Sequence, residues 1–257
     1  MPRVHPVPAG SVVDLGSFGS EALGGARRVR VYVPTSPSPG VRRPTLLLLD
    51  GQNVLGDEGS FSGGWFAHQS IDRVVASRLV APILVAIDNG GTARIDEYSP
   101  FSHAGRGGRA EVFLDVIANQ VLPAVHARFE VQPWFHVLGG SSMGGLASLY
   151  AHFRYPEVFP AAMCMSPAIW FGKDALFDFV ARQPNPRLSR VYLDCGGRED
   201  KGQMLPLVQS TAMHLESRGW STKSGPLRIM WRPDKKGAHN EAAWRRRLPK
   251  ALRFLFG

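Results

Sequence analysis

The segment Phe135–Phe153 reads FHVLGGSSMGGLASLYAHF, and it decides the fold because a glycine-rich turn joins a short apolar run to a helical pattern. Its centre, Gly140–Gly144, fits the pattern G-x-S-x-G, in which a serine on a tight strand-to-helix turn is held in a strained backbone conformation. The flanking glycines let neighbouring backbone approach the turn closely. Ser142 is therefore the candidate nucleophile.

The same motif can arise by chance in a chain with 28 glycines, and glycine-rich turns also precede helices for packing reasons alone. The order of strand, turn and helix around Ser142 favours the nucleophile over these alternatives. A phosphate cradle fits less well, because no Lys-Ser or Lys-Thr pair follows the glycines and G-x-G-x-x-G is absent.

Short apolar runs alternate with longer helical patterns on both sides of Ser142. This order predicts an α/β protein with a mostly parallel central sheet flanked by helices on both faces. Pro123 and Pro249 fall inside two of the helices and are expected to kink or split them. The expected strands are Val29–Val33, Thr45–Asp50, Ile83–Asp88, Phe135–Leu138, Ala161–Met165, Val191–Cys195 and Leu227–Trp231. The expected helices are Ile71–Ser77, Arg109–Phe129, Met143–Phe153, Ala175–Ala181, Leu205–Arg218 and Glu241–Leu255.

A length of 257 residues suits one domain of this class, so we expect a single domain over residues 1–257. Three Pro- and Gly-rich stretches, Pro34–Pro44, Gly56–Gly64 and Gly90–Gly108, are expected to be long loops. No apolar stretch approaches the roughly 18 residues of a membrane span, and the first residues lack the apolar core of a secretory signal. The sequence therefore indicates no membrane partner and a cytoplasmic location.

The chain carries 30 Lys and Arg against 21 Asp and Glu, and this net charge of +9 makes nucleic acid a partner to consider. A nucleic-acid site usually interleaves basic residues with aromatic residues or glycines on one element. We expect a solvated basic surface instead, and no nucleic-acid partner, because the basic residues are scattered. Their small clusters are Arg27-Arg28, Arg42-Arg43, Lys235-Lys236 and Arg245–Arg247.

A serine hydroxyl needs a histidine to take its proton and a third group to orient that histidine. In enzymes with this elbow the chain order is Ser, then Asp or Glu, then His, which eliminates every histidine before Ser142. His152 lies on the helix directly after the serine, and His214 lies within another helical pattern. His239, in a Gly-Ala-His-Asn loop between a strand and the last helix, is the candidate base.

The orienting carboxylate is expected just beyond the end of a strand that lies between the serine and the histidine in the chain. The run Val191–Cys195 is followed by Gly-Gly-Arg-Glu-Asp, so Glu199 and Asp200 are the candidates. Asp194 lies inside the apolar run, where its side chain is less suited to reach the edge of the sheet. Glu199 is preferred, and Asp200 stays open.

Acyl transfer through a tetrahedral intermediate needs preorganised N–H donors, each contributing roughly 2.7 to 4 kcal/mol of transition-state stabilisation. One donor is expected to be the backbone N–H of Met143, directly after the nucleophile. The second is expected in the turn that follows the strand TLLLLD at residues 45–50. We choose the N–H of Gln52, although an ordinary tight turn has the same pattern.

Together these motifs resemble the putative-esterase family of the α/β-hydrolase superfamily, which includes enterochelin-esterase-like and feruloyl-esterase-like enzymes. The resemblance covers most of the chain from about Val29 to Gly257. It rests on LLLLDGQNVL from Leu46, AIDNGG followed by Arg94, Glu97, Tyr98 and Pro100, GGSSMGG around Ser142, Ser166-Pro167 with Trp170, Gly196 to Glu199, and the terminal GAHNEAAWRRRLPKALRFLFG.

The resemblance implies an α/β-hydrolase fold with Ser142 as nucleophile, His239 as base and an acid three residues after a strand-end glycine. Counting from Gly196 or from Gly197 gives either of the two candidate acids, so the choice stays open. An oxyanion hole made by the N–H groups of Gln52 and Met143 is also implied. The positions that match cleft-lining residues of the family are Trp65, Arg94, Tyr98 and Trp170.

The sequence thus predicts a serine esterase that hydrolyses small-molecule carboxylic esters through an acyl-enzyme on Ser142, with no cofactor and no metal. Cys164 and Cys195 are read as inert core thiols without metal-ligand spacing nearby. Acyl transfer, as in the similar mycolyltransferases, uses the same site and stays an alternative. A basic nucleic-acid-binding protein on a hydrolase-like scaffold is the alternative from another class. The natural substrate, the acyl length and the oligomeric state stay open.

Overall fold

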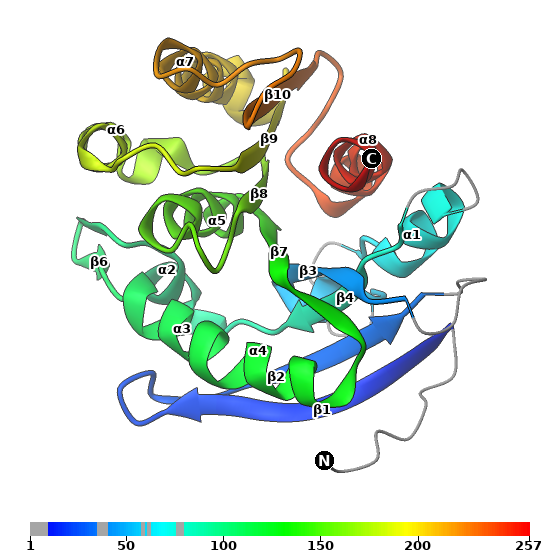
Figure 1. Cartoon of the computed structure of the whole chain (residues 1–257). Coiled ribbons are helices and arrows are strands. Elements are labelled where there is room, and N and C mark those ends of the chain that lie inside the picture. Colours follow the sequence, from blue (N-terminus) through cyan, green and yellow to red (C-terminus); the bar gives the residue numbers. More distant parts are fainter. Residues whose placement is uncertain (1–9, 35–40, 58–59, 61–62, 76–79) are drawn as a thin grey trace.

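The computed structural model describes residues 10–34, 41–57, 60, 63–75 and 80–257, and in this part of the chain a sheet of eight strands forms the centre (Figure 1). The strand order is β1-β2-β4-β3-β7-β8-β9-β10, and all strands from β4 to β10 along it run parallel. The predicted mostly parallel sheet is confirmed, with an antiparallel edge made by β1 and β2. The strands are β1 (Ser11–Ser20), β2 (Gly25–Val33), β3 (Arg43–Leu49), β4 (Ile83–Ile87), β7 (Val131–Ser141), β8 (Ala161–Met165), β9 (Ser189–Gly196) and β10 (Leu227–Asp234).

Helices cover both faces of the sheet, as predicted. Helices α1 and α8 lie together on one face, and the others pack on the opposite face (Figure 1). Each face has its own apolar cluster, so the sheet is buried on both sides. The helices are α1 (Ala67–Val75), α2 (Arg94–Tyr98), α3 (Ala110–Val116), α4 (Leu122–Arg128), α5 (Met143–Arg154), α6 (Lys173–Arg182), α7 (Met204–Ser217) and α8 (Glu241–Phe256).

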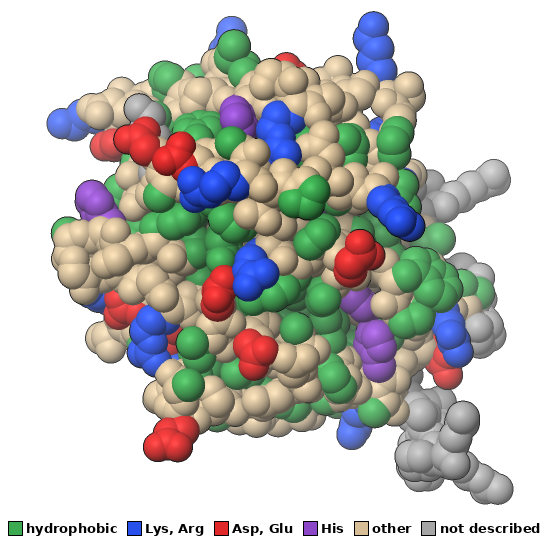
Figure 2. Space-filling view, turned by 60° about the vertical axis from the view of Figure 1, so that its left-hand side comes forward, with side chains coloured by type: hydrophobic (Ala, Val, Ile, Leu, Met, Phe, Trp, Pro, Cys, Tyr) green, Lys and Arg blue, Asp and Glu red, His purple; other side chains and the backbone are tan. Residues whose placement is uncertain are grey.

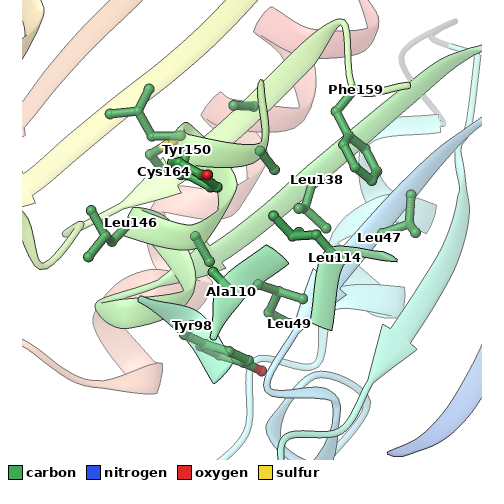
Figure 3. Packing of buried hydrophobic residues seen from close by; sticks show 14 of the residues in the cluster. Leu47, Leu49, Tyr98, Ala110, Leu114, Leu138, Leu146, Tyr150, Phe159 and Cys164 are labelled. Atoms are coloured by element: carbon green, nitrogen blue, oxygen red, sulfur yellow. The ribbon is translucent and has the colours of Figure 1, made fainter. Parts of the chain in front are cut away.

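Strand β3 shows how one apolar run supplies both clusters. Successive side chains of a strand point to opposite faces, so Leu46 and Leu48 join the cluster under α1 and α8. Leu47 and Leu49 join the other cluster, where they lie with Leu138 of β7 and with side chains from the helices of that face (Figure 3). Each fully buried leucine contributes roughly 1.5 to 3 kcal/mol, which explains why an all-leucine run forms the centre of the sheet.

Several segments differ from the prediction. The expected helix Arg109–Phe129 is divided into α3, a π-helical turn at Ile117–Val121 and α4, with Pro123 at the start of α4. Proline lacks an N–H for the helical ladder, which accounts for the split there. Pro249, by contrast, lies inside α8 without dividing it. The expected helix end at Ser77 lies outside the described residues.

The loop Gly90–Gly108 contains structure that the sequence pattern did not predict. It holds α2 and a small hairpin of β5 (Ser102–His103) and β6 (Arg106–Gly107). Strand β1 was also missed, because none of its residues is fully buried and its register with β2 shifts between Asp14 and Gly16. Across the described ranges, no helix is both long enough and apolar enough to cross a membrane.

Candidate active site

The candidate nucleophile lies where β7 meets α5. Ser142 has φ 56° and ψ −122°, a strained combination for any residue but glycine. Its N–H donates to Met165 O at 3.0 Å, and its carbonyl accepts from Ala168 N at 3.0 Å, so the strained backbone is held from both sides. A Cβ at Gly140 would lie 2.9 Å from the Gly144 backbone, which shows why the turn needs small residues.

His239 and Glu199 meet at the same edge of the sheet, from the loops after β10 and β9. The His239 Nδ1 and Glu199 Oε2 atoms are 2.8 Å apart. The His239 side chain is 34% exposed, whereas the Glu199 side chain is fully buried. Asp200, the other candidate acid, is exposed and makes no such contact within the described residues. Of the two candidate carboxylates, Glu199 is therefore the one in contact with His239.

The second carboxylate oxygen of Glu199 is held by a ring of donors. Its Oε1 atom accepts hydrogen bonds from the Gly196 N–H and the Ser166 hydroxyl, each at 2.7 Å. Burial by itself raises the pKa of Glu199, but the hydrogen bonds from His239 and Ser166 and the charge of Arg247 outweigh it. The pKa of Glu199 is lowered as a result, so the carboxylate beside His239 is ionised at neutral pH.

Arg247 connects this carboxylate with a second buried one. Its guanidinium is 3.3 Å from Asp194 Oδ2 and 3.4 Å from Glu199 Oε1, and it donates to the Ser166 hydroxyl at 2.8 Å. The indole N–H of Trp244 also donates to the Ser166 hydroxyl, at 3.0 Å. Burial raises the pKa of Asp194 to about 7 even beside Arg247. The buried Arg247 guanidinium therefore forms ion pairs with both carboxylates.

Sequence reasoning missed Arg247, Ser166 and Trp244 as supporting residues. A signal did exist in the last helix, because Arg247 falls three residues after Trp244 and next to Leu248, on the apolar stripe. A charged residue on a buried stripe needs a partner of opposite charge. The pattern of α8 therefore pointed to a buried carboxylate opposite Arg247.

The two predicted oxyanion donors lie on turns that begin α5 and follow β3. Gln52 belongs to a 3-10 turn, Gly51–Asn53, which starts after Asp50 in a left-handed conformation with φ 60°. The N–H of Met143 is in the first turn of α5, where a helix leaves its N–H groups without intrahelical acceptors. Within the described residues, neither the Gln52 N–H nor the Met143 N–H donates a hydrogen bond.

Arg94 and Tyr98 both contact Asp50, the residue that begins this turn. The Nε and Nη2 atoms of Arg94 bind the Asp50 carboxylate at 2.6 and 2.7 Å. The hydroxyl of the fully buried Tyr98 accepts the Asp50 N–H at 3.0 Å, and Asn89 donates to the same carboxylate. The structure therefore places these two residues against the turn that contains Gln52, and a role in substrate binding stays a prediction.

The other two predicted cleft residues have opposite environments. Trp65 is only 3% exposed and packs against Trp244, with ring centroids 5.9 Å apart. Trp170 is 52% exposed and lies two residues after Ala168, whose N–H binds the Ser142 carbonyl. Of the four residues expected at the cleft, Trp170 is the one that is more than half exposed.

The two cysteines and the arrangement of possible metal ligands concern thiol chemistry and metal binding. Cys164 and Cys195 are buried free thiols, and burial raises the pKa of both well above the usual range. In the part of the chain that the structure describes, no three His, Cys, Asp or Glu side chains gather as a metal site would require.

Comparison with known proteins gives a consistent result. The profile of the family described as "Putative esterase" matches residues 20–255. The uncharacterized protein YbbA of Bacillus subtilis is 25% identical over 254 residues, which cover 93% of this chain and 96% of that protein. The iron(III) salmochelin esterase of Escherichia coli is 26% identical over 259 residues, which cover 91% of this chain and 55% of the esterase. The chain therefore spans about half the length of that relative.

Among solved structures, an IroE-like serine hydrolase from Shewanella oneidensis superimposes with a TM-score of 0.76 at 17% identity. The match covers 96% of this chain and 80% of the other. At this identity the likeness shows the fold, which is that of the α/β hydrolases, as the sequence resemblance implied.

Proposed function

Because the chain belongs to the putative esterase family, we propose that it is a serine esterase that hydrolyses carboxylic esters through an acyl-enzyme on Ser142. The observation that carries the proposal is the 2.8 Å contact between His239 and the buried Glu199, at the same edge of the sheet as the strained serine. This is the arrangement of base and orienting acid that an elbow serine requires.

In the proposed reaction, Glu199 accepts the Nδ1–H of His239, so that Nε2 is unprotonated and can take the Ser142 proton. Ser142 Oγ makes no hydrogen bond within the described residues, and contact with Nε2 is the step that substrate binding completes. The Oγ–C bond forms, and the N–H groups of Gln52 and Met143 stabilise the oxyanion.

His239 then returns the proton to the leaving alcohol as the ester C–O bond breaks. Water attacks the acyl-enzyme by the same steps, its proton passes through His239 to Ser142, and the carboxylic acid leaves.

The substrate class follows from the relatives and from Trp170. The matched esterases of Escherichia coli are named for salmochelin and enterobactin, and we propose small-molecule esters for this chain too. The ring of Trp170 is 52% exposed and follows Ala168, whose N–H binds the Ser142 carbonyl, by two residues. We propose that this flat apolar surface contacts an aryl or other planar group of the substrate. On the face in Figure 2, Lys and Arg side chains are spread among Asp, Glu and apolar side chains, which supports a small substrate over nucleic acid there.

The test is hydrolysis of p-nitrophenyl acetate and butyrate by the wild-type chain and by Ser142→Ala. We expect measurable release of p-nitrophenol that Ser142→Ala abolishes, while both proteins keep the same circular dichroism. Equal activity in the two proteins would refute the proposal. Adding sugar alcohols during the reaction separates hydrolysis from acyl transfer, because a transferase forms the new ester in place of the free acid.

A further inference from the structure

A cavity of about 770 Å³ lies at the edge of the sheet opposite Ser142. Its walls are Trp134 and Phe135 in the first half of β7, the first residues of β9 and β10, the segments that lead into β8 and β9, and the turn Lys223–Pro226. Ser142, Glu199 and His239 all follow the carboxyl ends of these strands, so the cavity is separate from the candidate active site. Its volume is in the range of small-molecule sites, which is roughly 300 to 1,000 Å³.

Two arginines lie side by side in this cavity. Arg190 of β9 and Arg228 of β10 are direct partners in the register of the two strands, so their side chains leave the same face of the sheet. Like charges directly opposite each other on a sheet are destabilising. Burial and the charge of Arg228 lower the pKa of Arg190, which is the expected effect of two apposed cations.

In the part of the chain that the structure describes, no Asp or Glu side chain pairs with these arginines. Arg190 donates through Nη1 to the Leu255 carbonyl at 2.7 Å and to the Gly257 oxygen at 3.4 Å. Within the described residues, neither Arg190 nor Arg228 forms an ion pair with an Asp or Glu side chain. The Arg228 Nε atom is buried and has no hydrogen-bond partner there. Arg94 and Arg247, by contrast, are each paired with a carboxylate. The two cavity arginines therefore have donor capacity that an anion would satisfy.

The rest of the wall is basic and aromatic. Arg187 and Lys223 add two exposed cations, against one carboxylate from Glu157. Trp134 is 64% exposed at the rim, which is unusual for so large an apolar side chain. The Phe135 ring forms another apolar part of the wall and stacks with the Arg190 guanidinium, 5.8 Å from the ring centroid.

We propose that this cavity is a second ligand site, which binds an organic anion with a planar apolar body, such as an aryl carboxylate, sulfonate or phosphate. The paired guanidinium groups of Arg190 and Arg228 hold the anionic group. Trp134 and Phe135 contact the planar body. The site is independent of ester hydrolysis, since none of its residues lies at the carboxyl edge of the sheet.

The experiment is a fluorescence titration of the full chain with 8-anilinonaphthalene-1-sulfonate, compared with its uncharged analogue N-phenyl-1-naphthylamine. We expect one saturable site for the sulfonate, with binding at least about tenfold tighter than that of the neutral analogue. Arg228→Met keeps an apolar stem beside Phe254 but removes the charge, and is expected to weaken sulfonate binding about tenfold. Binding to Ser142→Ala should equal that of the wild-type chain.

Arg232→Met is the matched control, because Arg232 lies on the same face of β10, four residues toward the other edge, and is exposed. It should bind the sulfonate within about twofold of the wild-type chain. If Arg228→Met does not fold, Lys223→Met tests the proposal in its place. Lys223 is exposed, so its replacement should leave the fold intact and still weaken sulfonate binding a few-fold. Equal affinities for the two dyes, an unaltered affinity in Arg228→Met and Lys223→Met, or no saturable binding would overturn the proposal.

Discussion

Replacing Glu199 by glutamine tests the hydrogen-bond pattern around His239. Three donors converge on Glu199 Oε1, namely the Gly196 N–H, the Ser166 hydroxyl and the Arg247 guanidinium. A glutamine must therefore place its carbonyl oxygen at that position. Its NH2 group then takes the Oε2 position, 2.8 Å from His239 Nδ1. An NH2 donor there makes Nδ1 an acceptor and moves the imidazole proton to Nε2, where His239 can no longer act as a base.

The expected magnitude follows from this change of tautomer. The equivalent change in a serine protease triad lowers kcat by about 10⁴, with the geometry of the site intact. We expect a comparable loss in Glu199→Gln, which corresponds to about 5.5 kcal/mol of transition-state stabilisation. KM should change little, because Glu199 is buried beneath His239 and does not reach the substrate.

The assay is steady-state hydrolysis of p-nitrophenyl butyrate, with Asp200→Asn as the matched control. Asp200 is adjacent in the chain but exposed, and its positive φ of 43° is a conformation that asparagine tolerates. Asp200→Asn should stay within about twofold of the wild-type kcat. The reasoning is refuted if Asp200→Asn loses activity and Glu199→Gln keeps it, or if both variants stay active.

Three further predictions concern the groups that hold the site. In Gly196→Ala, the new Cβ would lie 2.4 Å from the Gly237 carbonyl oxygen and 2.5 Å from Glu199 Oε1, so Glu199 would have to move. We expect kcat/KM for p-nitrophenyl butyrate to fall about 100-fold in a folded protein, and near-wild-type activity would contradict this geometry. Arg94→Lys replaces two contacts to Asp50 by one and loosens the turn that carries Gln52. In the same assay kcat should therefore fall about tenfold; an unchanged kcat would show that the turn does not depend on Arg94. Burial raises the pKa of Asp194 to about 7, despite the charge of Arg247 and the hydrogen bonds from Ser166 and Tyr192, so the folded state binds more protons than the unfolded state between about pH 4 and 7. Its contribution to stability is present below about pH 4 and lost as the pH rises through about 7; urea midpoints at about pH 5 and 8 should therefore differ less in Asp194→Asn than in the wild-type chain, and equal differences would exclude a raised pKa.

The sequence predicted those parts of the fold that depend on local pattern. The leucine run Leu46–Leu49 could be recognised as a strand buried on both faces because both faces of its pattern are apolar. The strand, turn and helix around Ser142 were predicted for the same reason, since the motif and both elements lie within one short segment. The half-exposed edge strand β1 was missed, because its pairing with β2 depends on contacts that no local pattern contains.

The candidate site could be predicted to the level of chain order, but not of contacts. The search for an acid just after the strand Val191–Cys195 yielded two adjacent candidates. Only the three-dimensional path of the loop buries Glu199 and leaves Asp200 exposed. The burial of Tyr98 and Trp65 could not be predicted, since an aromatic residue in a loop segment has the same sequence signature whether it is buried or exposed. Trp170, with the same signature, is the exposed one.

The most direct test of the central claim is to find the acyl group itself. The wild-type chain is mixed with p-nitrophenyl butyrate, quenched with acid within the first turnover, digested, and the peptide that contains Ser142 is analysed by mass spectrometry. The proposed reaction predicts one butyryl group on Ser142, and none on the same peptide from Ser142→Ala. A butyryl group on another residue, or turnover by Ser142→Ala at the wild-type rate, would contradict the assignment of Ser142 as the nucleophile.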